Sequence, residues 1–423
     1  MTHVVIAPDK FKGTLTAAEV AEHVAAGLER ARPGTDAIQV PIADGGDGTI
    51  DAAEGAGYRK IEIGVRGPTG QPVTAAFAFS DGTAVIEAAQ ACGLALLPGG
   101  ALAPLTASSR GVGELILAAT RMRAKRIVLG LGGVATTDGG AGMVRAFGVR
   151  LLDEAGAEFP QGGAALTRLH ELNLSRMRDM SGIEFVVATD VDNPLLGPLG
   201  AAAVYGPQKG ATPEDVALLE DGLIRWADAV EGTLGSAHRD TPGAGAAGGL
   251  GFAALAFLNA TVRPGIDLLL DLVNFPAHLA GARLVITGEG ALDRQTLHGK
   301  APAGVAHATA AAAADVPVIA VAGISSLTAD QLRDAGITRA YALTDIEPDE
   351  ERCRANPGPL LERLTEQIAR DWLLPGRRRT FGAAPWRCVS LAQLARSSGL
   401  DSASGTLAPP RGRQPRTEPD ETA

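Results

Sequence analysis

The sequence predicts an α/β protein: a parallel sheet covered by helices and interrupted by an inserted second α/β domain with a mixed sheet. Both ends of the chain alternate short apolar runs with helical patterns, and this alternation produces a parallel sheet with helices on its faces. The middle of the chain instead contains consecutive apolar runs joined by short turns, which indicates antiparallel pairing. With 423 residues, the chain has room for two domains. We expect the first domain at residues 1–64 and 281–375 and the second at residues 65–280.

The N-terminal elements follow one another as strand, helix and strand. His3–Ala7 is a short apolar run that predicts the first strand. Thr16 and Glu19 form a capping-box pattern in front of a helix that runs from Ala17 to about Arg30. A break at Pro33-Gly34 separates this helix from a second strand, which we expect at Ala37–Ile42.

The middle and C-terminal elements are predicted from the same two patterns. Antiparallel strands are expected at Ile61–Val65, Val73–Phe79 and Thr83–Ala88. Further into the insertion, we expect a helix at about Gly113–Arg121 and strands at Arg126–Leu131 and Phe185–Ala188. The C-terminal part supplies strands at Arg283–Thr287, Val316–Ala322 and Ala340–Leu343. Helices are expected near Ala303–Ala314, Ala329–Asp334 and Pro359–Trp372.

Composition and charge exclude several classes of protein. The net charge is −10 and aromatic residues make up only 4%, which argues against a nucleic-acid-binding groove. No uncharged apolar stretch reaches about 18 residues, so we expect no membrane span. The three cysteines lack metal-ligand spacing and the N-terminus lacks a signal-peptide pattern, so we expect a cytoplasmic protein. The tail, residues 376–423, is rich in Pro, Ser, Gly and Arg, and we expect it to be disordered.

Glycine-rich loops that each carry an acidic or basic residue are the main functional signal. There are seven: Pro8–Lys12 (PDKFK), Asp44–Thr49 (DGGDGT), Gly130–Met143 (GLGGVATTDGGAGM), Thr189–Pro194 (TDVDNP), Gly206–Ala211 (GPQKGA), Gly243–Gly251 (GAGAAGGLG) and Gly288–Lys300. Each glycine costs conformational entropy on folding, so a structural protein has little use for so many such loops. Together they favour a ligand-binding cleft.

The segment Leu284–Lys300 (LVITGEGALDRQTLHGK) is the most informative of these. Its apolar start predicts a buried strand that stops at Gly288, at the carboxyl edge where ligands bind in open α/β sheets. Glu289, Asp293 and Lys300 follow within one loop. Glycine lets backbone N–H groups approach an anion, lysine supplies a point charge for phosphate, and the two acids suit a Mg²⁺ ion that arrives with a nucleotide. These groups are the ones that phosphoryl transfer needs.

Other cofactor and catalytic patterns fit less well. The pattern G-x-G-x-x-G/A occurs at Gly130–Ala135 and Gly243–Gly248, but neither run lies between a strand and a helix as a dinucleotide site requires. The P-loop pattern is absent, since Ala301 follows Gly299-Lys300. No serine lies in G-x-S-x-G and no Cys–His pair is evident, so covalent acyl chemistry has no support.

Several charged residues have both a functional and a structural interpretation. Asp190 and Asp192 follow an apolar run and could hold Mg²⁺ or orient a substrate hydroxyl, whereas an Asx turn explains them equally well. Arg110 precedes a helix, where it would either hold an anion or be solvated. Asp44 and Asp47 could instead cap the helix that follows them.

Eight motifs, in this order and at this spacing, resemble the signature loops of the bacterial glycerate kinases. They are PDKFK (8–12), ADGGDGT (43–49), SSRGVGEL (108–115), GGVATTDGGAGM (132–143), ATDVDNPLLG (188–197), GPQKGA (206–211), PGAGAAGGLG (242–251) and TGEGALDRQTLHGKAP (287–302). The resemblance runs from residue 1 to about residue 372. The sequence departs from the family pattern at Val134 and Thr137, where Ser and Asn are usual.

The resemblance implies ATP-dependent, Mg²⁺-assisted phosphorylation of D-glycerate, with the 2-hydroxyl favoured, in a cleft between a Rossmann-like domain and the inserted domain. Asp190 would orient or deprotonate the attacking hydroxyl, and Lys300 would neutralise the transferring phosphoryl group. The expected catalytic residues are Asp190, Lys300 and Asp44, and the expected metal ligands are Asp44, Glu289 and Asp293. The expected substrate and phosphate contacts are Lys10, Lys12, Arg110, Asp138, Lys209, Gly132, Gly133, Gly245, Gly248, Gly288 and Gly290.

The expected partners are therefore glycerate and ATP, with no nucleic acid and no membrane, for a monomer or a homodimer. The sequence is also compatible with two other functions. One is a nicotinamide-dependent hydroxyacid dehydrogenase, which the two imperfect glycine patterns would serve. The other is a sensor that binds a hydroxyacid or a nucleotide without turnover.

Overall fold

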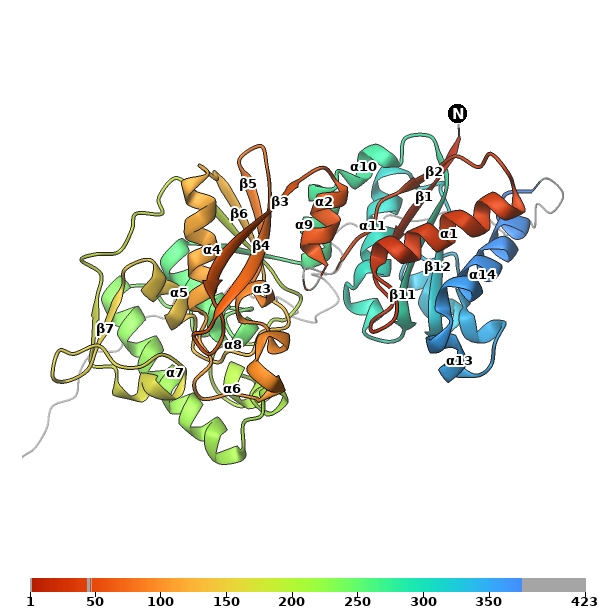
Figure 1. Ribbon diagram of the computed structural model, residues 1–423. Helices are drawn as coiled ribbons and strands as arrows, with labels where there is room; N and C mark the ends of the chain where they lie inside the picture. The colour runs from red at the N-terminus through yellow and green to blue at the C-terminus, as the bar shows by residue number, and fades with distance from the viewer. Residues whose placement is uncertain (1, 44–45, 47, 375–423) are drawn as a thin grey trace, which may run out of the picture. The chain divides into compact units, whose positions relative to one another are not determined.

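Two large sheets organise the helices of the protein (Figure 1). The computed structural model describes residues 2–43, 46 and 48–374. Asp44, Asp47 and the expected tail at 376–423 lie outside these residues. A mixed α/β fold with one parallel and one mixed sheet confirms the predicted fold class.

The first sheet combines strands from both ends of the chain and is parallel throughout. Its strand order is β13-β12-β11-β1-β2. The strands are β1 (His3–Pro8), β2 (Ala37–Gln39), β11 (Ala282–Leu292), β12 (Val318–Ser325) and β13 (Arg339–Ala342). Side chains that alternate along β1 enter different cores: Val4 and Ile6 pack on one face, and Val5 and Ala7 on the other. Both faces are therefore covered, which explains why these strands are continuous apolar runs.

Strand β11 does not stop at Gly288 as the sequence suggested, but continues to Leu292. Its pairing with β1 ends at Pro8↔Gly288, whereas its pairing with β12 extends to Leu292↔Ser325. Glu289 thus lies within a strand that is paired on one side only. Strand β2 is conversely shorter than expected, although the N–H of Ile42 still donates to the carbonyl of Pro8 at 3.0 Å.

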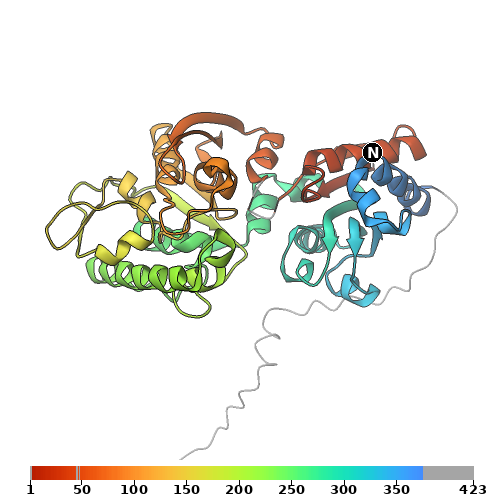
Figure 2. The same ribbon diagram turned by 60° about the horizontal axis from the view of Figure 1, so that its bottom comes forward.

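Helices α1 (Ala17–Ala31) and α14 (Pro357–Trp372) lie side by side on one face of the first sheet (Figures 1 and 2). The expected capping box of Thr16 and Glu19 is present at the start of α1. The other face is covered by α9 (Gly265–Leu272) and α11 (Ala301–Ala312). The remaining helices of this part are α10 (Phe275–His278), α12 (Ala329–Asp334), α13 (Glu350–Ala355), η5 (Thr296–His298) and η6 (Leu343–Asp345).

The second sheet is mixed, with the strand order β10-β9-β6-β5-β4-β3. Its strands are β3 (Arg59–Arg66), β4 (Pro72–Ser80), β5 (Thr83–Glu87), β6 (Arg126–Gly130), β9 (Glu184–Ala188) and β10 (Thr261–Arg263). The pairs β3–β4 and β4–β5 are antiparallel and the others are parallel. Because β3 begins at Arg59, the second sheet starts six residues before the expected boundary. The two-domain division itself stays a prediction, since residues 1–374 form one compact unit.

The second sheet has its own helices and its own core, which includes Phe77, Ile86 and Leu115. The helices are α2 (Thr49–Gly55), α3 (Ala89–Cys92), α4 (Arg110–Arg121), α5 (Ala141–Ala146), α6 (Ala201–Tyr205), α7 (Pro213–Leu234), α8 (Ala246–Leu258), η1 (Leu94–Leu96), η2 (Pro98–Gly100), η3 (Ala164–Arg168) and η4 (Pro207–Lys209). A small antiparallel pair, β7 (Arg150–Leu152) and β8 (Glu171–Asn173), completes it. Helices α7 and α8 were not predicted from the sequence. None of the helices in the described part of the chain is long and apolar enough to cross a membrane.

Candidate active site

The carboxyl ends of four parallel strands line one hollow of about 630 Å³, which we call the edge pocket. Asp9–Lys12 follow β1, Glu289–Ala291 belong to β11, Gly323 and Ile324 to β12, and Leu343 and Thr344 follow β13. The chain leaves β1 toward β2 on one side of the sheet, and continues from β11 through β12 to β13 on the other. The strand order therefore reverses between β1 and β11, which is the position where open α/β sheets bind their ligands.

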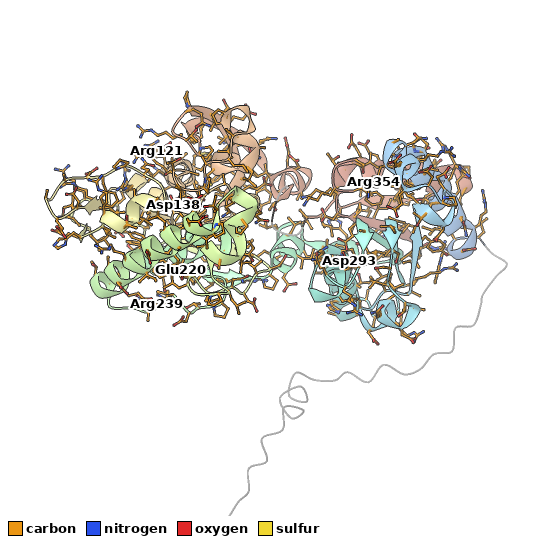
Figure 3. The ribbon with its side chains drawn as sticks, turned by 90° about the horizontal axis from the view of Figure 1, so that it is seen from below. Arg121, Asp138, Glu220, Arg239, Asp293 and Arg354 are labelled. Carbon is orange, nitrogen blue, oxygen red and sulfur yellow. The ribbon has the colours of Figure 1, made fainter. Side chains whose placement is uncertain are left out.

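Charged side chains of both signs line the edge pocket, and among its described residues the basic ones outnumber the acidic ones by four to three. Lys10, Lys12, Lys300 and Arg354 line it, together with the carboxyl groups of Asp9, Glu289 and Glu350. Phe11, Cys353 and Pro357 add apolar surface to the same lining. Figure 3 labels Asp293 and Arg354 in this part of the chain. A pocket with lysines at a strand edge and an apolar wall fits a ligand that combines phosphates with an aromatic or aliphatic part.

Lys300 lies between two carboxylates. Its Nζ is 3.6 Å from Glu289 Oε2 and 4.0 Å from Asp293 Oδ1. Thr296 donates a hydrogen bond from its hydroxyl to Glu289 Oε1. Burial raises the pKa of the Glu289 carboxyl, while the Thr296 hydroxyl and the Lys300 ammonium act in the opposite direction. The expected grouping of Glu289, Asp293 and Lys300 is therefore present.

Three of the expected glycines line the edge pocket and three do not. Gly132, Gly133 and Gly290 are in the lining, and a Cβ on Gly290 would meet the backbone nitrogen of Lys12 at 3.3 Å.

The other three glycines are needed for packing. A Cβ on Gly288 would lie 2.3 Å from the carbonyl oxygen of Val321. On Gly245 it would lie 2.2 Å from the carbonyl oxygen of Pro194, and on Gly248 2.0 Å from that of Thr136. Real Cβ atoms do not approach this closely, so tertiary packing requires these glycines whether or not a ligand binds there.

Asp138 lies in the interior and holds a loop together. Its side chain is 1% exposed and accepts hydrogen bonds from the N–H and hydroxyl of Ser109 and from the N–H groups of Gly140 and Gly142, at 2.9 to 3.1 Å. Burial raises the pKa of this carboxyl. Since its oxygens are occupied by the protein, Asp138 fixes the loop that follows β6 and does not line the edge pocket.

Lys209 is also buried and also bound to the protein. Its Nζ donates to the carbonyl oxygen of Thr136 at 2.5 Å and lies 3.4 Å from the Thr137 hydroxyl. Burial lowers the pKa of the Lys209 ammonium to about 8. Thr137, one of the two positions that depart from the family pattern, thus has a structural partner. Lys209 joins η4 to the loop after β6 and is absent from the lining of the edge pocket.

Asp190 and Arg110 lie outside the lining of the edge pocket. Asp190 is exposed just beyond β9, and its Oδ1 accepts a hydrogen bond from the N–H of Gly265 at 2.9 Å. Because β6 and β9 are parallel neighbours that pair Gly130 with Ala188, Asp190 shares a sheet edge with the loop that carries Gly132 and Gly133. Arg110 instead begins α4, where its Nε is 3.2 Å from Glu114 Oε1.

Three residues of the edge pocket were not among the predicted site residues: Asp9, Phe11 and Arg354. Asp9 directly follows β1, just as Asp190 follows β9, so its position after an apolar run is a signal that could have identified it. Arg354 belongs to α13, distant in sequence from every glycine loop, and no local pattern marks it. Asp44, expected as a catalytic and metal-binding residue, lies outside the described residues.

No group of three or more acidic, histidine or cysteine side chains that could hold a metal occurs in the described ranges 2–43, 46 and 48–374. Glu289 and Asp293 nevertheless share one lysine, so two carboxylates face the same point. Mg²⁺ that arrives with a nucleotide needs only one or two protein carboxylates, because phosphates and water supply its other ligands. This pair therefore fits a nucleotide-borne Mg²⁺ and does not form a complete metal cage.

The fold and the edge pocket define a class of protein: an α/β protein with a lysine-lined pocket at the switch point of a parallel sheet. Comparison with known proteins gives the family. Residues 4–373 match the glycerate kinase family model, and the chain belongs to the glycerate kinase family.

Relatives with functional names support this membership along most of the chain. The chain is 45% identical to a glycerate kinase from Bacillus subtilis (strain 168) over 370 residues, which cover 86% of this chain and 96% of that protein. It is 43% identical to a glycerate 2-kinase from Escherichia coli (strain K12), over 77% of this chain and 86% of that protein. A crystal structure of a protein assigned as glycerate kinase 2 from Salmonella typhimurium LT2 matches with a TM-score of 0.75 and 39% identity, covering 87% and 97% of the two chains.

Proposed function

We propose that this kinase transfers a phosphoryl group from ATP to D-glycerate with the help of Mg²⁺, and that the 2-hydroxyl is the acceptor. The observation that carries this proposal is the edge pocket, where three lysines and glycine backbone meet at the switch point of the parallel sheet. Phosphoryl transfer depends mainly on positioning and on neutralising charge, and these groups do both. The name glycerate 2-kinase of the Escherichia coli relative supports the choice of hydroxyl.

Within the edge pocket, Lys10, Lys12 and Lys300 are the groups that would hold the phosphates. Phe11, Cys353 and Pro357 would cover the less polar part of the nucleotide. Lys300 has the central role, since its ammonium is already held at the pocket by Glu289 and Asp293. A lysine there would stabilise the negative charge that spreads over the transferring group.

Glu289 and Asp293 are the residues that would hold Mg²⁺, together with Asp44. When bound, Mg²⁺ would neutralise phosphate oxygens and help to orient the transferring group. Lys300 now balances the charge of both carboxylates. The same two carboxylates would be shared between the ion and the lysine once the nucleotide is bound.

Asp190 is our candidate for orienting or deprotonating the attacking hydroxyl. It is exposed at the sheet edge that also carries Gly132 and Gly133, two residues of the edge pocket. Its hydrogen bond to the Gly265 N–H helps to fix the position of the carboxylate in the loop. A carboxylate in that position can accept the proton of a substrate hydroxyl.

A coupled assay tests the proposed reaction. ADP release that requires D-glycerate supports the kinase, an absorbance change with NAD⁺ would indicate a dehydrogenase, and binding without turnover would indicate a sensor. Phosphorus NMR of the product distinguishes 2-phosphoglycerate from 3-phosphoglycerate.

The role of Asp190 is tested by Asp190→Asn, with Asp221→Asn at an exposed position of α7 as the control. The amide that replaces the carboxylate keeps an oxygen for the Gly265 N–H, so the fold should be retained. We expect turnover to fall by about 10²–10⁴-fold, which is the usual contribution of a general base, and the control to stay near the parent value. Normal turnover in Asp190→Asn would exclude this role.

We also propose a cytoplasmic location and a monomeric or homodimeric state. The thiols of Cys92 and Cys353 are free, as is usual for a reducing compartment. Size-exclusion chromatography with light scattering measures the oligomeric state directly.

A further inference from the structure

A second hollow of about 810 Å³ lies against α4 and β3, and four arginines line it. They are Arg66, Arg110, Arg121 and Arg178, and among the described residues Glu114 is the only acidic one in the lining. We call this hollow the arginine groove. It shares none of its described lining residues with the edge pocket. The net charge of −10 is already sufficient to keep the chain soluble, so solubility does not explain this local excess of positive charge.

The α4 side of the groove has a regular spacing. Arg110, Glu114, Leu117 and Arg121 follow one another at intervals of four, three and four residues, so they lie on one face of the helix. The first and last of them are eleven residues apart, which corresponds to about 16 Å along the helix axis. Figure 3 labels Arg121, the last residue of α4. The positive charge is therefore distributed along a groove and not focused on a single point.

One end of the groove is partly neutralised by the protein itself. Glu114 Oε1 lies 3.2 Å from Arg110 Nε and 3.9 Å from Arg66 Nε, and Glu114 Oε2 accepts a hydrogen bond from the backbone N–H of Arg66 at 2.8 Å. One carboxylate is thus shared by two guanidinium groups. These two arginines keep donors that Glu114 does not use, because each guanidinium has five N–H groups.

The other end carries charge that the protein does not neutralise. The side chains of Arg121 and Arg178 are exposed, and neither has a hydrogen-bond or ion-pair partner in the described part of the chain. Asp179, the acidic neighbour of Arg178, is engaged with the N–H of Ser181 at 2.7 Å. Arg178 is held in place through its backbone, whose N–H donates to the carbonyl of Phe147 at 2.8 Å.

We propose that the arginine groove binds an extended small polyanion, of the oligophosphate or bisphosphate class, at a site separate from the edge pocket. Arg121 and Arg178 bind one end of the anion, and Arg66 and Arg110 bind the other. Arginine suits this task because its planar fork gives paired hydrogen bonds to phosphate oxygens. This inference does not depend on the proposed reaction, and it gives Arg110 a role in anion binding outside the edge pocket.

The test is calorimetric titration of the full chain with inorganic tripolyphosphate and, separately, with orthophosphate. The double variant R121Q/R178Q removes the uncompensated end of the groove. The matched control is R59Q/R363Q, which removes the same charge from two exposed arginines outside the groove, whose side chains have no ion-pair partner among the described residues. Circular dichroism and urea unfolding of all three proteins show whether each variant is folded.

We expect tripolyphosphate to bind the arginine groove at least about tenfold more weakly in R121Q/R178Q than in the parent chain, since each hydrogen bond to a charged group contributes strongly. R59Q/R363Q should bind like the parent. Orthophosphate should bind more weakly than tripolyphosphate because it cannot reach both ends, and added salt should weaken both.

If the edge pocket also binds phosphates, the parent has two sites and only the groove site is weakened in R121Q/R178Q. If it does not, the parent has one site and that site is weakened in the variant, so the two proposals fail separately. Equal tripolyphosphate binding by the parent and R121Q/R178Q would overturn the proposal. So would an equal loss in R59Q/R363Q, which would indicate diffuse attraction to net charge.

Discussion

Lys300 is the residue to which we assign the neutralisation of the transferring phosphoryl group. In the structure, its Nζ forms ion pairs with Glu289 Oε2 at 3.6 Å and with Asp293 Oδ1 at 4.0 Å. We expect Lys300→Met to lower kcat by about 10²–10³-fold, the usual cost of removing one group that stabilises transition-state charge. The matched control is Lys60→Met, whose parent lysine makes a surface ion pair with Asp51 at 3.6 Å. Steady-state kinetics with ATP and D-glycerate measure the kcat of each variant. Equal kcat values in Lys300→Met and Lys60→Met would contradict the proposed role of Lys300.

Lys209 gives a second prediction at this scale, for the pH dependence of stability. The pKa of its ammonium is lowered from 10.5 to about 8 in the folded protein, first of all by burial. Between these values the folded protein has lost a proton that the unfolded chain still binds, so the contribution of Lys209 to stability rises with pH. From pH 7 to pH 9.5 this amounts to about 2 kcal/mol.

The difference between the parent chain and Lys209→Met isolates that contribution. Urea unfolding at both pH values should show the parent gaining about 2 kcal/mol relative to the variant at the higher pH. A difference that does not change with pH would mean that Lys209 is charged in the folded protein. The comparison within a pair of proteins removes the titration of all other groups.

The sequence could identify several residues of the edge pocket as candidates, but it could not separate them from charged residues that are buried elsewhere. Glu289 and Asp138 each belong to a glycine loop with an acid, and nothing local distinguishes them. In the structure Glu289 lines the edge pocket, whereas Asp138 is enclosed by donors from Ser109, Gly140 and Gly142. Only tertiary contacts decide which acid faces a ligand. The same holds for Arg354, which reaches the pocket from a helix without any motif.

At the scale of elements, the close contact between α1 and α14 depends on one glycine. A Cβ on Gly27 would lie 2.4 Å from the carbonyl oxygen of Glu362 and 2.8 Å from the Cβ of Thr365. The backbone oxygen cannot move without shifting α14. We therefore expect Gly27→Ala to destabilise the protein by about 1–3 kcal/mol, as overpacking does.

Gly232 in α7 is the matched control for Gly27. It is also helical, but a Cβ there would meet nothing within 4 Å. Gly232→Ala should stabilise the protein by about 0.4–1 kcal/mol, because alanine restricts the unfolded chain and costs nothing in the helix. Chemical unfolding of the parent and of both variants measures the two changes in the free energy of unfolding. Two changes of the same sign would contradict the assignment of Gly27 to a tight helix contact.

The elements themselves were largely predictable where they have a local pattern. The capping box at Thr16 and the apolar run of β1 are examples, since both depend on residues close in sequence. The end of β11 was not predictable, because the strand continues through Gly288 and Gly290 only where β12 offers it hydrogen-bonding partners. Helix α8 was missed for a related reason: its first turn contains left-handed Ala247, Gly248 and Gly249, so no capping pattern precedes it.

At the scale of the whole molecule, a nucleotide bound in the edge pocket should stabilise the entire fold. A ligand that binds only the folded state at one hundred times its Kd adds about 2.7 kcal/mol to the free energy of unfolding. We expect this gain with a non-hydrolysable ATP analogue and Mg²⁺, and we expect EDTA to remove most of it. Urea unfolding with and without EDTA measures the effect, and Lys300→Met should reduce it. A gain that survives EDTA in full would argue against Mg²⁺ in the complex.

The neighbouring positions of β1 and β11 have a consequence for the synthesis of the chain. Strand β1 ends at residue 8, but its partner β11 begins at residue 282. At about 5–20 residues per second, a ribosome needs roughly 15 to 55 seconds to cover that interval. The strands of the second sheet, from Arg59 to Arg263, are all made within it. The second sheet can therefore form first, whereas the apolar faces of β1 and α1 have no native partners until β11 and α14 have been made.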